Sequence, residues 1–96
     1  MTVAPDSRLL TPDSIPKLWR MTRLQFDPVR QRSVLLYPEG AVLLNDTGAA
    51  ILELCNGSNT VDQIVSILTE RYHADVSSYV TEYLSLMAER ELIRAG

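Results

Sequence analysis

The chain has 96 residues, a formal net charge of −3 and a sequence pI near 5.0, and 46% of its residues are hydrophobic. This length supports one domain with a modest core and excludes a second active domain. The acidic balance argues against a nucleic-acid or anionic-membrane binder, because phosphate contacts need clustered lysine and arginine.

Single cysteine and histidine residues restrict the chemistry of the chain. Cys55 and His73 are the only residues of their types, so a disulfide or a Cys-His zinc site within one chain is excluded. An unpaired cysteine suits a reducing compartment. The sequence also lacks a long apolar run and a basic-then-apolar N-terminus. We therefore expect a cytoplasmic protein without a membrane segment, metal or cofactor.

The N-terminal stretch is expected to be a flexible arm over residues 1–16, followed by one folded domain over residues 17–96. Three prolines within the arm prevent a long helix. Residues 17–26 then predict a first strand, because apolar and polar residues alternate from Thr22 onward. Asp27-Pro28 ends this strand.

Two further strands are predicted on either side of a Pro38-Glu39-Gly40 turn. Pro38 fixes φ for the turn, and Gly40 can take positive φ without a Cβ clash. The strand after the turn carries no charge and no proline, and no later strand pattern follows it. It is therefore predicted to be an unprotected sheet edge, unlike the first strand with its arginines. The residues of this edge are Ala41, Val42, Leu43 and Leu44.

Three helices are predicted in the rest of the chain, at about residues 47–55, 61–72 and 76–91. Asn45 or Asp46 is expected to cap the first helix, and Thr60 with Gln63 fits a capping box for the second. The third helix has an unusually wide apolar face, with Tyr79, Tyr83 and Leu86 on its rim. Three antiparallel strands followed by three helices predict an α+β, winged-helix-like fold.

Catalytic constellations are missing from the sequence. The single histidine lies in a polar connection between helices, and Cys55 on an apolar helix face is interpreted as a small buried hydrophobe. There is no glycine-rich phosphate loop and no metal-ligand spacing. We expect no enzymatic activity of its own.

The unprotected edge of the third strand is compatible with three functions. A peptide could add a strand to it, which predicts that proline at Val42 or Leu43, whichever has its N–H pointing outward, weakens peptide binding. Alternatively, the chain is a structural homodimer, paired through this edge or through a swapped hairpin. A DNA-binding winged helix is the least favoured, because the polar face of the third helix offers serines and glutamates, with only Arg90 near its end.

Several segments in combination resemble the PqqD family, the peptide chaperones of pyrroloquinoline quinone (PQQ) biosynthesis. They are Arg-Leu-Gln-Phe-Asp at 23–27, Val-Leu-Leu-Tyr-Pro-Glu-Gly at 34–40, Leu-Asn at 44–45, Ile-Leu-Glu-Leu-Cys-Asn-Gly at 51–57 and Thr-Val at 60–61. The resemblance spans roughly residues 16–93. The last helix departs from the family pattern, with Tyr79-Val80 where Asp-Val is expected.

The resemblance implies a winged-helix-like recognition element for a ribosomally made peptide. Such a protein would bind the precursor PqqA by strand addition and present it to the radical-SAM enzyme PqqE, without catalysing a reaction. The peptide would lie beside the third strand and against the third helix. By position, the expected contact residues are Ala41, Val42, Leu43, Leu44, Tyr79, Tyr83, Leu86 and Arg90.

Overall fold

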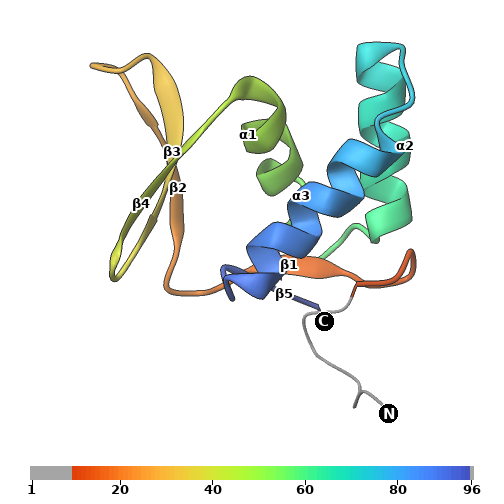
Figure 1. Cartoon of the computed structure of the whole chain (residues 1–96), viewed down its shortest axis with the longest axis horizontal. Coiled ribbons are helices and arrows are strands. Elements are labelled where there is room, and N and C mark those ends of the chain that lie inside the picture. The colour runs from red at the N-terminus through yellow and green to blue at the C-terminus, as the bar shows by residue number, and fades with distance from the viewer. Residues whose placement is uncertain (1–9, 96) are drawn as a thin grey trace.

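The computed structural model describes residues 10–95, which form an α+β domain with a three-stranded sheet projecting to one side of the helices (Figure 1). This confirms the predicted α+β class. The elements in chain order are β1 (Pro16–Leu18), β2 (Arg23–Asp27), β3 (Arg32–Tyr37), β4 (Gly40–Leu44), α1 (Asp46–Glu53), α2 (Val61–Tyr72), α3 (Ser77–Glu89) and β5 (Ile93–Ala95).

The larger sheet has the antiparallel order β2-β3-β4, so β4 lies at an edge as predicted. The connection from β3 to β4 is two residues long, since Tyr37 pairs directly with Gly40. Gly40 does not use the positive φ that glycine permits. A Cβ atom at this position would lie 3.4 Å from the Tyr37 hydroxyl, which is an ordinary contact, so the space around Gly40 does not require glycine either.

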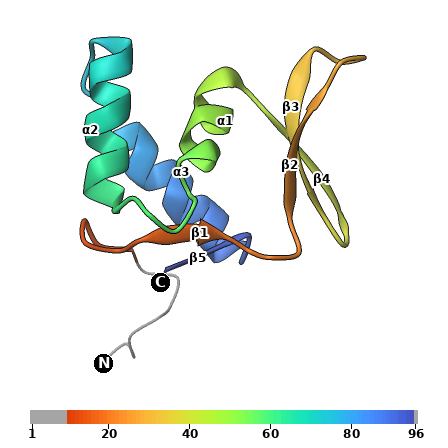
Figure 2. The same cartoon turned by 180° about the vertical axis from the view of Figure 1, so that it is seen from behind.

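A second, two-stranded sheet joins the two ends of the described chain, and the sequence pattern did not predict it. β1 pairs antiparallel with β5, with Leu18 opposite Ile93. The single strand expected over residues 17–26 is therefore two strands in different sheets. They are separated by a turn in which the Thr22 backbone N–H and hydroxyl both donate to the Trp19 carbonyl, at 2.8 and 2.7 Å. Both views show this small sheet beneath α3 (Figures 1 and 2).

The helices begin where the capping residues predict. The Asn45 side chain accepts a hydrogen bond from the Gly48 N–H at 2.7 Å at the start of α1. Thr60 and Gln63 form the predicted capping box of α2. α2 ends at His73, which takes a left-handed φ of 54° and is exposed to solvent.

The core lies between the inner face of the larger sheet and the three helices. Its fully buried members include residues from β3, α1, α2, α3 and β5, which shows that one core unites both sheets. They include Leu35, Ile51, Leu52, Ile64, Leu68, Val80, Leu84, Met87 and Ile93. Within residues 10–95, none of the helices is long and apolar enough to cross a bilayer.

Part of the expected flexible arm packs on the domain. The carbonyls of Pro12 and Ser14 accept hydrogen bonds from the backbone N–H groups of Asp62 and Val61, at 3.1 and 2.9 Å. These two donors are otherwise unpaired because they lie in the first turn of α2. The folded unit thus extends at least to Leu10, which packs against the core. Residues 1–9 of the expected arm lie outside the described residues, as does residue 96.

Candidate functional site

The outer edge of β4 presents unpaired backbone groups. Residues along an antiparallel strand point their N–H and C=O groups alternately toward and away from a given neighbour. Because Tyr37 and Gly40 close a two-residue loop, Gly40, Val42 and Leu44 point these groups toward β3. Ala41 and Leu43 therefore point theirs outward. Both residues are exposed, so the edge offers two donors and two acceptors to an extended peptide.

The four edge residues expected from the sequence are thus not equivalent. The Leu44 side chain is buried in the core, and Val42 packs partly against it. Neither residue directs its backbone groups to the edge. The Arg32 guanidinium also donates to the Leu44 carbonyl at 3.3 Å, which further occupies this end of the strand. Only Ala41 and Leu43 of the expected set face an incoming strand.

The predicted residues of α3 form one stripe along the helix. Tyr79, Tyr83, Leu86 and Arg90 are spaced by four, three and four residues, which places them on one side. Tyr79 and Leu86 are 43% and 49% exposed, so this side is not closed by the core. The rings of Tyr79 and Tyr83 stack with centroids 6.2 Å apart and planes 7° apart. The stripe is an apolar, partly aromatic surface.

Contacts at the start of α1 bring this stripe next to the end of β4. The Asn45 side-chain amide donates to the Tyr79 hydroxyl at 3.2 Å, and Asn45 directly follows β4. Tyr83 lies against the same turn, since a Cβ atom on Gly48 would be 2.6 Å from its hydroxyl. The burial of Tyr83 raises the pKa of its phenol, with a smaller effect from Tyr79. Gly48 thus allows the tyrosine pair to approach the edge strand.

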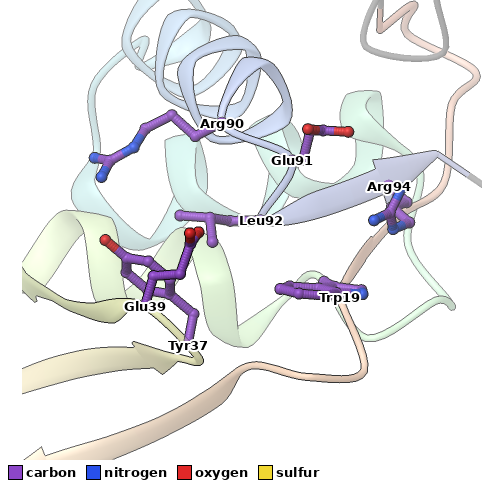
Figure 3. A pocket seen from close by; sticks show the side chains of 7 residues that line it. All are labelled: Trp19, Tyr37, Glu39, Arg90, Glu91, Leu92 and Arg94. Atoms are coloured by element: carbon purple, nitrogen blue, oxygen red, sulfur yellow. The ribbon is translucent and has the colours of Figure 1, made fainter.

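A hollow of about 460 Å³ joins the other end of the stripe to the hairpin tip (Figure 3). Arg90 from the end of α3 lines it together with Tyr37 and Glu39 from the β3–β4 hairpin. On its far side the Arg94 guanidinium lies 5.7 Å from the centre of the Trp19 ring. The stripe therefore approaches the hairpin near Asn45 and again near Glu39. Sequence reasoning missed the hollow because its walls come from three separate segments of the chain, around residues 19, 37–39 and 90–94.

The remaining candidate for chemistry, Cys55, is a structural residue. It is 2% exposed, and its thiol donates to the Ile51 carbonyl at 3.4 Å. Burial raises the pKa of the thiol to about 12, so the reactive thiolate is suppressed at neutral pH. No group of metal-binding side chains occurs within residues 10–95.

Cys55 is expected to react with a thiol reagent such as DTNB far more slowly in the folded chain than in denaturant.

The raised pKa of Cys55 also predicts a pH dependence of stability. Above the ordinary thiol pKa, the Cys55 thiol loses its proton in the unfolded state but keeps it in the folded state. Stability is therefore expected to fall between about pH 9 and 12, by at most about 1.4 kcal/mol per pH unit. Chemical denaturation at several pH values checks this, with Cys55→Ala as the control that removes this contribution. Labelling of the native thiol at the denatured rate would contradict the burial.

Comparison with known proteins places the chain in a family. The family model described as coenzyme PQQ synthesis protein D (PqqD) matches residues 32–93. The chain belongs to the PqqD family. This membership confirms the resemblance seen in the sequence, together with the expectation of a recognition protein rather than an enzyme.

Individual relatives support this assignment across most of the chain. A protein of Azotobacter vinelandii named PqqA binding protein is 41% identical over 85 residues, covering 86% of this chain and 92% of the relative. One of the same name from Methylococcus capsulatus is 46% identical over 65 residues, covering 68% and 70%. A bifunctional coenzyme PQQ synthesis protein C/D of Methylorubrum extorquens is 43% identical over 74 residues, which are 77% of this chain and 20% of that protein.

A solved structure agrees with the fold. It is the solution NMR structure of the PqqD truncation of Methylobacterium extorquens PqqCD, described as a functional and stand-alone recognition element for ribosomally synthesised and post-translationally modified peptides. The two structures superpose with a TM-score of 0.74 at 35% sequence identity, covering 92% of this chain and 97% of the other. The arrangement of sheets and helices is thus a property of the PqqD family.

Proposed function

We propose that the chain binds the precursor peptide of PQQ biosynthesis, a PqqA-like peptide, by adding it as a strand to the outer edge of β4. The names of the relatives, PqqA binding protein, and the description of the solved PqqD truncation as a peptide recognition element support the choice of ligand. The observation that carries the proposal is the outward-facing pair Ala41 and Leu43. Strand addition uses unpaired backbone groups of this kind.

The edge and the α3 stripe have complementary roles in this proposal. Four backbone hydrogen bonds at about 1 kcal/mol each contribute about 4 kcal/mol, which alone corresponds to millimolar affinity. Micromolar affinity needs about 4 kcal/mol more, or at least about 160 Å² of buried apolar surface. The exposed parts of Tyr79 and Leu86 are positioned to supply such surface beside the edge. The backbone would set the peptide's orientation, and the stripe would select its side chains.

The hollow at the hairpin tip places polar and charged side chains at one end of the surface formed by the β4 edge and the α3 stripe. Arg90 and Arg94 line this hollow, and neither makes an ion pair with any described residue. Glu39 lines the same hollow. A peptide lying along β4 would pass from the tyrosine pair at Asn45 to this charged end. Arg90 therefore completes the proposed set of contacts at the far end of the stripe.

We further propose that the bound peptide is presented to a radical-SAM enzyme, as the family resemblance implies. In this scheme the recognition domain, predicted from the sequence as residues 17–96 and extended by the packing of the preceding residues to at least Leu10, acts in the cytoplasm. It supplies binding and orientation, while the enzyme supplies the chemistry. The natural joining of a PqqD-like segment to another PQQ synthesis protein in Methylorubrum extorquens supports an enzyme partner in general.

A homodimer is the second candidate, favoured by the same bare edge. Two copies of β4 pairing side by side would satisfy the groups of Ala41 and Leu43 without a peptide, and a swapped hairpin is the other route to a dimer. The two proposals differ in their response to ligand: self-pairing through β4 would compete with the peptide. Light scattering over a concentration series, with and without peptide, separates them. A dimer unaffected by peptide favours the structural role.

Titration of labelled precursor peptide into a Tyr79→Ala, Leu86→Ala variant tests the proposed groove. We expect affinity to fall about tenfold, because both side chains lose apolar surface that the peptide would cover. Ile67→Ala on α2 is the matched control, since Ile67 is similarly exposed but lies outside the stripe. Equal affinities for the wild type and the double variant would contradict the role of the stripe.

A further inference from the structure

The face of the larger sheet that points away from the helices is unusually apolar. By register, Val34 lies between Gln25 and Leu43, and Leu36 lies between Arg23 and Ala41. These side chains alternate with Leu35 and Val42, which point into the core. Val34 is only 6% exposed, yet it does not belong to the main core cluster. It lines a hollow together with other residues of the larger sheet.

A hollow of about 480 Å³ lies over this outer face. Its walls are Gln25, Phe26, Asp27, Pro28, Arg30, Val34, Leu36, Ala41 and Leu43. An antiparallel sheet with one solvated face normally alternates apolar and polar residues, whereas strands that are apolar on both sides are typical of sheets covered on both sides. The run from Val34 to Tyr37 is apolar or aromatic at every position, and Leu43 is 49% exposed. The pattern indicates that another molecule covers this face.

Charge argues that the covering molecule is a different protein rather than a second copy. By alternation Arg23 and Arg32 lie on the same face as Leu36, and Arg30 lines the hollow. Asp27 is the acidic member of this group, and it is paired with Arg30 at 3.0 Å. A two-fold dimer through this face would bring the arginines of both copies together, which is unfavourable. A partner with an apolar centre and an acidic rim fits better.

We infer that this outer face is the docking surface for the enzyme that modifies the bound peptide; the inference rests on the proposed function. The face is continuous with the peptide edge, since Leu43 contributes its backbone to the edge and its side chain to the outer face. A peptide added beside β4 would extend the same sheet, and every second side chain of the peptide would point to the outer face. The enzyme would thus contact the peptide and its carrier on one continuous surface.

Charge reversal at Arg23 and polar replacement at Leu36 test this docking surface. Purified Arg23→Glu and Leu36→Asn chains are titrated with precursor peptide and, separately, with the purified radical-SAM enzyme of the pathway, in the presence and absence of peptide. We expect enzyme affinity to fall at least tenfold while peptide affinity stays within twofold. Ile67→Asn on α2 is the control, and thermal melting verifies that each variant is folded.

Different outcomes separate the docking surface from the proposed function. Enzyme affinity equal to wild type in both folded variants would overturn the docking surface, as would a wild-type dimer that Arg23→Glu dissociates. Failure of the wild-type chain to bind peptide would overturn the proposed function instead. In that case the docking surface is tested by the affinity of the enzyme for the peptide-free chains. A tenfold loss of enzyme affinity in the two variants supports the docking surface, and unchanged enzyme affinity overturns it.

Discussion

Replacing Leu43 by proline is expected to weaken precursor-peptide binding by about fivefold or more, because at least one backbone hydrogen bond is lost. The register places the Leu43 N–H on the outer edge of β4, where it is free to donate to an added strand. Proline removes this donor and puts its ring in the path of the peptide. Proline is tolerated at such edge positions, so the domain should remain folded.

Two companion variants make this result specific. Leu43→Ala keeps the N–H and should retain most of the affinity, which separates the backbone donor from the side chain. Val42→Pro removes an N–H that points to β3, and it should disrupt the hairpin rather than the binding alone. Isothermal titration combined with circular dichroism distinguishes these cases. Wild-type affinity in a folded Leu43→Pro chain would contradict strand addition at this edge.

Replacing Ile93 by alanine is expected to destabilise the domain by about 2–4 kcal/mol, because the truncated side chain leaves a cavity in the core. Ile93 is 2% exposed and also holds β5 opposite Leu18 of β1. For a domain of this size such a loss lowers the melting temperature by on the order of 10 °C or more. Arg94→Ala, at an exposed neighbouring position, should stay within about 1 kcal/mol of the wild type, because it loses only its contact with the Trp19 ring.

Chemical denaturation of both variants checks the importance of the small sheet. Equal stabilities for Ile93→Ala and Arg94→Ala would show that pairing of the chain ends contributes little. The comparison of these two variants concerns the β1–β5 sheet, which the sequence pattern did not predict. It therefore tests whether β1 and β5 are integral to the fold.

Local signals in the sequence were sufficient to predict much of the fold. The hairpin around Pro38 and Glu39, the edge position of its second strand and the capping box at Thr60 all depend on residues close together in the chain. The two-stranded sheet does not: three-residue strands are too short to show alternation, and their partners lie more than 70 residues apart. The positive φ that glycine permits is not used at Gly40, because this residue lies outside the turn and is the first paired residue of β4.

The candidate site was predictable in outline but not in detail. Helical spacing alone placed Tyr79, Tyr83 and Leu86 on one rim. Which edge residues face outward depends on strand register, and register excluded the Leu44 side chain from the site. The charged hollow with Trp19 and Arg94 requires tertiary packing of distant segments. The features that the sequence did not predict therefore depend on contacts between segments far apart in the chain, and not on local propensity.

Amide hydrogen exchange by NMR, on the ¹⁵N-labelled chain with and without precursor peptide, tests strand addition most directly. In the free chain the Ala41 and Leu43 amides should exchange fast, because they lie at an open edge, while the Val42 amide is protected by β3. Peptide should slow exchange at Ala41 and Leu43 and leave Val42 nearly unchanged. Binding of the peptide without added protection at Ala41 and Leu43 would contradict the account.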